Sequence, residues 1–209
     1  MADPADPWPL IHTEREALAG DLATLTDEQW ATPSLCAGWS VRDVLGHMTS
    51  TAKMTPPAFL MAMAGAGFRF NTMAARGVAR ETAGTPAEGL AEFRRYSQAT
   101  SHPPGPINTW LSETVVHATD IRRPLGLTRD YPEPTLVRTA DFVKVTNPLL
   151  GARRRIEGLS LHATDADWAS GSGPDVSGPL LSLIMAMTGR QAALAELSGE
   201  GVAILGERG

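Results

Sequence analysis

The most informative stretch of the sequence is INTWLSETVVHATDIRRPLG, residues 107–126, which has the periodicity of one helix. At 3.6 residues per turn, His117 and Asp120 lie within about 40° of Glu113 around the helix axis. Apolar side chains flank this polar group: Trp110, Val116 and Ile121. The three polar side chains therefore occupy the middle of an apolar arc, where a carboxylate and an imidazole are costly unless they are paired or bound to a metal.

Glu113 and His117 are four residues apart, so both side chains can reach one ion from the same helix. A catalytic zinc site needs a third protein ligand and keeps its fourth position open. Among the four other histidines, His47 is the one in the middle of a predicted helix, at the edge of an apolar arc. We therefore predict that His47, Glu113 and His117 bind a divalent metal ion, and that Asp120 fixes an imidazole tautomer from outside. The spacing alone also fits a simple hydrogen bond along one helix.

Capping and turn residues predict a mainly α protein in two parts. Residues 1–130 are expected to form a four-helix bundle, and residues 131–209 a small α/β domain. The expected segments of the bundle are a helix with a stripe from Ile11 to Leu25, a loop at 27–39, and helices at 40–56, 85–101 and 107–125. The expected segments of the second part are a helix at 133–150, a strand or hairpin at 155–173, a helix at 177–197 and a strand at 199–205.

The composition is that of an ordinary globular protein. The chain has 209 residues, 43% of them hydrophobic and 20% charged, and a formal net charge of −5. This charge argues against a protein that coats nucleic acid, which needs a surplus of Lys and Arg. The apolar window at residues 57–68 is too short to span a bilayer, so it predicts a buried helix or a lid and no membrane partner. A single cysteine, Cys36, cannot form an internal disulfide, and together with the absence of a targeting segment it favours the cytoplasm.

Three stretches of the chain resemble one protein family. PSLCAGWSVRDVLGHM (33–48) and SETVVHATDIRRPLG (112–126) resemble the second-helix and fourth-helix motifs of the DinB-like, mycothiol-dependent maleylpyruvate isomerase family. The tail at residues 161–202 is similar to the C-terminal region of the same family. The three matches touch both halves of the chain and occur in the family's order.

The resemblance implies a DinB-like bundle and a divalent metal, usually zinc, held by two histidines and one glutamate. Carried onto this sequence, these residues are His47, Glu113 and His117, the same three that the helix geometry selects. It also implies that mycothiol, a low-molecular-weight thiol of actinobacteria, enters the open position as cosubstrate. The thiolate would then attack a small electrophile, as an isomerase or as an S-transferase.

Two further side chains carry weaker predictions. Arg190, in a Thr-Gly-Arg sequence, is a candidate for holding a carboxylate of the substrate or the thiol, the alternative being a surface or capping arginine. Cys36 is interpreted as a small buried side chain, although its loop leads into the helix of His47 and could bring it near the metal. The alternative functions are a zinc-dependent hydrolase of a small ester or amide, and a non-catalytic metal-binding or ligand-binding stress protein.

Overall fold

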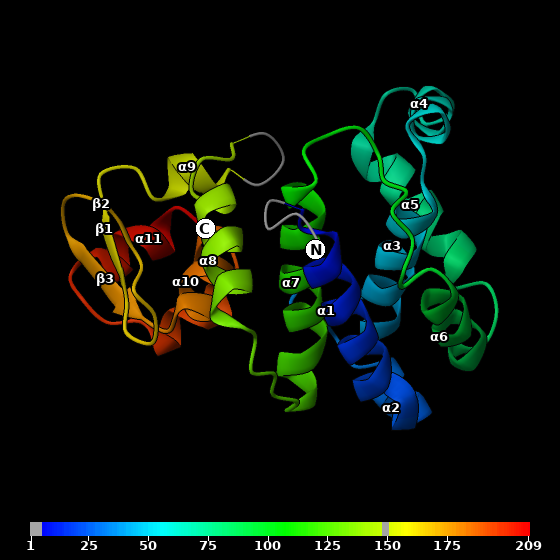
Figure 1. The fold of residues 1–209 in the computed structure, drawn as a ribbon, viewed down its shortest axis with the longest axis horizontal. Helices are drawn as coiled ribbons and strands as arrows, with labels where there is room; N and C mark the ends of the chain where they lie inside the picture. Colours follow the sequence, from blue (N-terminus) through cyan, green and yellow to red (C-terminus); the bar gives the residue numbers. More distant parts are fainter. Residues whose placement is uncertain (1–5, 148–150) are drawn as a thin grey trace. The chain divides into compact units, whose positions relative to one another are not determined.

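The computed structural model describes residues 6–147 and 151–209, and it is mostly helical (Figure 1). The chain divides into two compact units, which meet in sequence between Thr128 and Arg129. The N-terminal unit is built of helices, and the C-terminal unit combines helices with a three-stranded sheet. The mainly α class predicted from the sequence is therefore confirmed.

Four helices form the centre of the N-terminal unit. They are α1 (Trp8–Asp21), α3 (Val41–Lys53), α6 (Pro86–Arg95) and α7 (Asn108–Arg122). Helix α7 packs against α1 and α3, and α6 also packs against both of these helices. Their apolar side chains share one core that includes Leu18, Val44, Leu45, Phe93 and Ile121. The predicted four-helix arrangement is therefore confirmed, with short 3-10 turns at Leu22–Thr24 and Arg123–Leu125 extending α1 and α7.

The predicted capping sequences set where α3 and α6 begin. The Ser40 backbone N–H donates to the Asp43 carboxylate at 2.9 Å, while the Ser40 side chain accepts from the Asp43 backbone N–H. Thr85 and Glu88 form the same reciprocal pair at the start of α6. These pairs satisfy N–H groups that the first turn of a helix leaves without partners. The cap at Ser40 fixes the register of α3, and with it the direction of His47.

Two helices of the N-terminal unit were not predicted. The expected loop at residues 27–39 contains the short helix α2 (Asp27–Trp30), because Thr26 and Gln29 form a further reciprocal cap. Helix α5 (Phe70–Glu81) packs closely along α3. A Cβ atom at Gly77 would lie 2.6 Å from the Ser50 hydroxyl oxygen, so the glycine permits this close approach of the two helices.

The apolar window at residues 57–68 forms helix α4 (Pro56–Gly65), but the prediction that it is buried is wrong. No side chain of α4 is buried, and Leu60 and Met61 are 64% and 71% exposed. The two prolines at its start interrupt the chain after α3, and α4 packs mainly against α5 rather than in the bundle core. No helix in the described parts of the chain is long and apolar enough to cross a membrane.

The C-terminal unit packs helix α10 (Leu180–Met187) against helix α8 (Glu133–Val143) and a small sheet. The strand order is β2-β1-β3, with β1 antiparallel to β2 and parallel to β3. The strands are β1 (Ser160–Ala163), β2 (Ala169–Gly171) and β3 (Asp175–Gly178). The remaining helical segments are α9 (Ala152–Arg155), the 3-10 turn Gln191–Glu196 and α11 (Gly201–Glu207).

Three boundaries in this unit differ from the prediction. The expected strand at 199–205 is wrong, because Gly199 takes a φ of +109° and the chain then turns into α11. The helix expected at 177–197 is interrupted at Gly189, whose φ is +90°. The helix expected at 133–150 ends at Val143, and the last three positions of that prediction lie outside the described residues.

Candidate functional site

Helices α3 and α7 bring the three predicted metal ligands together. Glu113 and His117 lie one turn apart on α7, and His47 faces them from α3. The His47 Nε2 atom is 4.0 Å from the Glu113 Oε1 atom. The His47 and His117 rings meet edge to face, with 5.0 Å between their centroids. The geometry therefore brings two imidazoles and one carboxylate to the contact between the two helices, with His47 next to both Glu113 and His117.

The Glu113 carboxylate is buried without a hydrogen-bond partner among the described residues. Its side chain is 10% exposed, and neither carboxylate oxygen has a donor. The Thr51 hydroxyl is nearby, but it donates to the His47 carbonyl at 3.0 Å. Burial raises the pKa of Glu113, and the charges of His117 and Arg15, together with the nearby Thr51 hydroxyl, oppose this shift without cancelling it. A buried carboxylate in this condition needs a proton or a cation.

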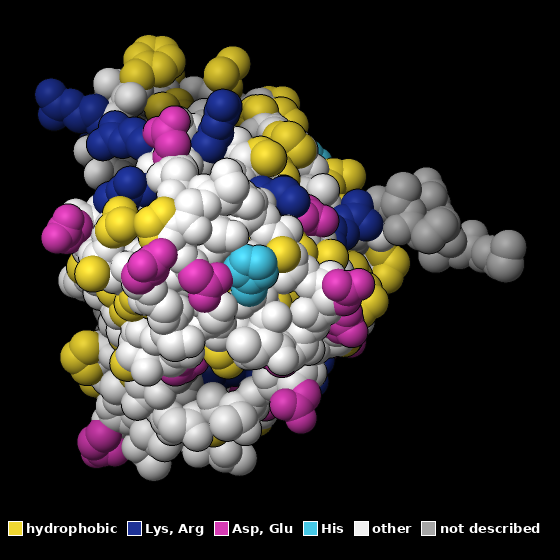
Figure 2. All heavy atoms as spheres, turned by 90° about the vertical axis from the view of Figure 1, so that its left-hand side faces the viewer, with side chains coloured by type: hydrophobic (Ala, Val, Ile, Leu, Met, Phe, Trp, Pro, Cys, Tyr) yellow, Lys and Arg dark blue, Asp and Glu magenta, His cyan; other side chains and the backbone are white. Residues whose placement is uncertain are grey.

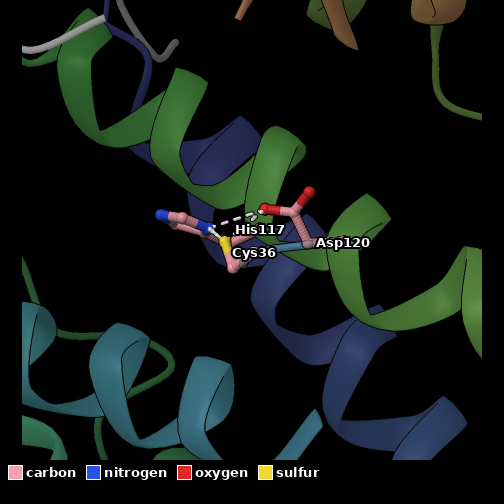
Figure 3. A group of neighbouring side chains, drawn as sticks. All are labelled: Cys36, His117 and Asp120. Atoms are coloured by element: carbon pink, nitrogen blue, oxygen red, sulfur yellow. Dashed lines mark hydrogen bonds and ion pairs between the residues drawn. The ribbon is translucent and has the colours of Figure 1, made fainter. Parts of the chain in front are cut away.

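His117 is held through one ring nitrogen. Its Nδ1 donates to Asp120 Oδ2 at 2.9 Å, and the Cys36 thiol donates to the same oxygen at 3.1 Å. Figure 3 shows Nδ1 directed toward Asp120 and Cys36, while Nε2 points away from both. Burial alone would lower the pKa of His117, but the hydrogen bonds with Asp120 and Cys36 outweigh it and raise the pKa to about 10. The imidazole thus has a fixed orientation, as ligating histidines have.

The second imidazole has the opposite electrostatic environment. Burial, and then the charge of His117, lower the pKa of His47 to about 3. The ring also contacts Trp39, with 5.1 Å between the centroids. His47 is therefore neutral at physiological pH, which is the form of histidine that binds metal ions.

The loop before α3 brings Cys36 to this site. The Leu35 backbone N–H donates to the Asp120 carbonyl at 3.2 Å, and the Ser34 hydroxyl donates to the Trp39 carbonyl at 2.7 Å. The first bond joins the loop to α7, and the second holds the loop in its own conformation. The Cys36 sulfur then lies 3.6 Å from His117 Nδ1. Cys36 is half-buried, and its contacts with His117 and Asp120 go beyond the small buried side chain that its sequence context predicts. The available signal was the position of its loop directly before the helix of His47.

A second set of potential metal ligands also contains His117. In the described residues, one ligand atom each from Cys36, His117 and Asp120 lies within 4.8 Å of the other two. The predicted ligands His47, Glu113 and His117 do not form a group as close as this. The hydrogen bonds among Cys36, Asp120 and His117 Nδ1 already satisfy this second set. Its carboxylate, Asp120, is fully buried. By contrast, the carboxylate of Glu113, one turn before His117 on α7, has no hydrogen-bond donor among the described residues.

Arg190 belongs to the C-terminal unit, whereas the other predicted site residues belong to the N-terminal unit. It directly follows Gly189, and its Nη1 atom donates to the Thr188 carbonyl at 2.9 Å. Its charge, after burial, contributes to lowering the pKa of Arg155. Arg190 therefore stands in a cationic neighbourhood of its own unit.

The C-terminal unit also has a polar pocket of about 810 Å³, lined by residues that include Arg154, Arg155, Glu157 and Arg208. Two of its arginines hold the backbone together: Arg155 donates to the Met187 carbonyl at 2.6 Å, and Arg208 donates to the Glu157 carbonyl at 2.6 Å. In the view of Figure 2, Lys and Arg side chains gather toward the upper part of the face, and Asp and Glu side chains are spread over the rest. The charges on this face are therefore mixed.

Comparison with known proteins agrees with the predicted resemblance. Residues 11–102 match the family model "Mycothiol maleylpyruvate isomerase N-terminal domain". A crystal structure of the mycothiol-dependent maleylpyruvate isomerase is similar over 92% of this chain and 91% of that chain, with a TM-score of 0.64 and 16% sequence identity. The crystal structure of a histidine-to-alanine mutant of the mycothiol-dependent maleylpyruvate isomerase has the same coverage and identity, with a TM-score of 0.62. No curated protein matches the chain at a significant level.

At 16% identity, the structural likeness establishes a shared fold. The family model covers α3 with His47, and it ends before α7 with Glu113 and His117. The resemblance predicted from the sequence is confirmed: residues 11–102 match the model of that family's N-terminal domain, and the chain shares the fold of the mycothiol-dependent maleylpyruvate isomerase.

Proposed function

We propose that this protein is a metal- and thiol-dependent enzyme that uses mycothiol as cosubstrate and acts on a small electrophile, as an isomerase or an S-transferase. The observation that carries the proposal is the buried Glu113 carboxylate, which has no hydrogen-bond donor among the described residues and lies 4.0 Å from His47 Nε2. The family match and the shared fold support the choice of thiol. The electrophile is a small molecule. Maleylpyruvate is the first candidate, because the protein with the similar crystal structure is named as an isomerase of maleylpyruvate.

The donor set fits a divalent ion such as zinc. Two imidazoles and one carboxylate are a common catalytic zinc set, in which neighbouring ligand atoms lie about 3.3 Å apart. The 4.0 Å between His47 Nε2 and Glu113 Oε1 is within about 1 Å of that spacing, a change that side-chain rotation accommodates. An ion bound to His47, Glu113 and His117 would supply the positive charge that favours the thiolate form of a bound thiol.

The side chains around the ligands would prepare the site. Asp120 holds the proton of His117 on Nδ1, so that Nε2 is the nitrogen directed to the site. The Trp39 ring packs at a tilt against the His47 ring, which restricts the movement of this imidazole. The Cys36 thiol donates to the buried Asp120, which argues that it positions this carboxylate and that the nucleophilic thiol comes from outside the chain. Arg190 is proposed to bind a carboxylate of the substrate or thiol, because a guanidinium group pairs with a carboxylate through two hydrogen bonds.

The decisive experiment measures turnover of maleylpyruvate and of an alkyl halide by the zinc-loaded protein, with and without mycothiol. We expect turnover of at least one electrophile, and only with the thiol. Equal turnover with and without mycothiol would reject the thiol-dependent function and favour a hydrolase. Binding of zinc without turnover under either condition would favour a binding protein.

Matched variants connect this activity to the site. Glu113→Gln keeps the shape of the side chain but removes the charge that a metal ion needs, so the purified variant should lose most of its zinc and its activity. Glu133→Gln, at the exposed start of α8, is the control and should keep both. The comparison uses elemental analysis for the zinc and the same turnover assay. Full zinc content in Glu113→Gln would remove Glu113 from the proposed ligand set.

A further inference from the structure

Helix α4 is apolar on the side that it exposes to solvent. Between its end residues, the exposed positions are three or four residues apart and form one stripe: Pro57, Leu60, Met61 and Ala64. The positions between them are half-buried, and α4 packs against α5. A surface helix normally has polar residues on its outer side, and a helix that is apolar all round is normally buried. The composition of α4 therefore points to something that covers this outer stripe.

The turn after α4 adds an exposed aromatic ring. The Phe68 backbone N–H donates to the Met63 carbonyl at 2.8 Å, and the Gly67 N–H donates to the Ala64 carbonyl at 3.0 Å, which is a common way to end a helix. This motif needs a left-handed φ at Gly67, which is +63°, but Phe68 also has a positive φ, +58°. A bulky residue is rare in this conformation, and the Phe68 side chain is 72% exposed. Backbone strain at an exposed ring suggests that the ring has a function.

The exposed apolar side chains of the molecule are concentrated here. Four large apolar residues are mostly exposed in the described parts of the chain, and three of them are Leu60, Met61 and Phe68. The fourth is Val145, in the C-terminal unit. Figure 1 shows α4 at the margin of the N-terminal unit, beside α5. We call the outer stripe of α4, together with Phe68, the α4 face.

The sequence around the α4 face carries only positive charges. Residues 54–80 include three arginines and no Asp or Glu, although the whole chain has a net charge of −5. Arg69 directly follows Phe68 and is exposed. The Arg76 Nη1 atom donates to the Gly65 carbonyl at 2.6 Å, so this guanidinium lies against the C-terminal end of α4. An apolar face with arginines beside it is complementary to a surface that is both apolar and negatively charged.

We propose that the α4 face attaches the protein to the surface of a membrane that contains anionic lipids. Leu60, Met61 and Phe68 would enter the boundary between headgroups and acyl chains, and Arg69 and Arg76 would contact anionic headgroups. At ten residues, or about 15 Å, α4 would lie in this surface and not cross it. The expectation of no membrane partner concerned a span across the bilayer, and a helix in its surface has no such length requirement.

The size of the α4 face favours a membrane over a second copy of the chain. One side of a helix about 15 Å long covers roughly a few hundred Å², whereas a stable dimer buries about 800 Å² on each partner. Two copies joined through the α4 face would also bring their arginines together, and like charges repel. A lipid surface needs no matched shape, because each apolar side chain contributes as it leaves water.

Co-sedimentation of the full chain with lipid vesicles tests the proposal. Vesicles of phosphatidylcholine alone are compared with vesicles in which about a third of the lipid is phosphatidylglycerol, at about 0.1 M salt. We expect the protein to bind the anionic vesicles and to bind the neutral ones at least about tenfold more weakly. Equal binding to both kinds of vesicle, or binding to neither, would overturn the proposal.

Matched variants connect the binding to the α4 face. Leu60→Gln removes an apolar side chain and should weaken binding about tenfold, and Arg69→Gln removes one charge and should weaken it about fivefold. The control is Val145→Gln, because Val145 is similarly exposed, at 62%, and lies outside the α4 face. It should bind the anionic vesicles like the unaltered protein. Equal binding by Leu60→Gln and Val145→Gln would overturn the proposal.

Phe68→Gly distinguishes a role in binding from a role in the fold. Glycine adopts a φ of +58° without strain, so this variant should keep its melting temperature while its membrane binding falls about tenfold. Light scattering without lipid provides a further test, because a dimer that Leu60→Gln dissociates would show that a second copy covers the α4 face and would overturn the proposal. The measurements are made with and without zinc, so their outcome does not depend on the proposed function.

Discussion

The site contains two buried carboxylates on one helix, and their surroundings give them different roles. Asp120 accepts hydrogen bonds from His117 Nδ1 and from the Cys36 thiol. Glu113, two turns earlier on α7, has no donor for either oxygen among the described residues. A partnered carboxylate fixes its neighbours, whereas an unpartnered one remains available to a cation. The environment of each group therefore supports Glu113 as the metal ligand and Asp120 as the residue that orients His117.

Substitution of Asp120 tests this division of roles. Asp120→Asn keeps the size of the side chain and removes the charge that holds the proton of His117 on Nδ1. We expect its zinc affinity to fall about 10- to 100-fold, the usual effect of losing such a partner. Competition titration against a chromogenic chelator measures the affinity, and Asp141→Asn in the C-terminal unit serves as the control. An unchanged zinc affinity in Asp120→Asn would show that Asp120 does not act on the ligand.

The pKa shifts predict how metal affinity depends on pH. In the metal-free protein the pKa of His117 is raised to about 10, so His117 carries an extra proton at neutral pH, and burial raises the pKa of Glu113. His47, with a pKa of about 3, is already neutral. Because a bound ion must displace the extra proton of His117, affinity should rise with pH and fall as pH drops, by about tenfold per pH unit for each proton displaced. Zinc titrations at pH 6 and pH 8 measure the slope, and equal affinities would contradict it.

Some of these residues could be found from the sequence and others could not. Glu113, His117 and Asp120 share one helix, so the 3.6-residue period is enough to place them on one face. Arg15 reaches Glu113 from a helix nearly a hundred residues earlier in the sequence. The contact between Cys36 and Asp120 depends on hydrogen bonds of the loop before α3 to α7. Contacts of this kind form only through packing, and no local pattern reports them.

At the scale of helices and strands, the accuracy of the prediction follows the strength of local signals. Helices α3 and α6 begin where the caps at Ser40 and Thr85 predict, because a side-chain cap acts within four residues. Helix α5 was missed because what stabilises it is close packing on α3, where Gly77 lies against Ser50. Helix α11 was predicted as a strand because its short apolar run fits both structures equally well.

Lys53, the last residue of α3, joins three helices. Its ammonium group lies 2.7 Å from Glu81 of α5 and 2.6 Å from Glu92 of α6. Lys53→Met would leave the Glu81 side chain, which is 6% exposed, with only Arg80 as a cation partner in the described structure. We expect a loss of about 1–2 kcal/mol in the free energy of unfolding, between the values for exposed and buried pairs. Urea denaturation followed by circular dichroism measures the loss.

The control for this prediction is Lys144→Met in the C-terminal unit, because Lys144 pairs with the exposed Asp141 within one helix turn. It should change stability by no more than about 0.5 kcal/mol. Burial lowers the pKa of Lys53, but its bonds to Glu81 and Glu92 outweigh this and raise it. The stabilisation is therefore complete below the ordinary lysine pKa and is lost as pH rises through the raised value. Equal stability losses in the two variants would contradict a special role for Lys53.

At the scale of the whole molecule, the proposed ligands join segments that are far apart in the sequence. His47 lies in the matched family domain, and Glu113 and His117 lie beyond it on α7. An ion held by all three would link α3 to α7 across the core of the N-terminal unit. The unfolded chain has no such preformed site, so the free energy of metal binding adds to the stability of the folded state.

Zinc should therefore stabilise the intact protein against heat. At a free zinc concentration about 1,000 times the dissociation constant, binding to the folded state alone adds about 4 kcal/mol to the free energy of unfolding. Calorimetry of the chelator-treated protein, with and without added zinc, should show a higher melting temperature with the metal. The gain should disappear in His47→Ala and remain in His162→Ala, whose side chain is 51% exposed on β1. A gain that survives in His47→Ala would place the stabilising zinc ion elsewhere in the molecule, because an ion between α3 and α7 cannot keep its affinity after losing one of three protein ligands.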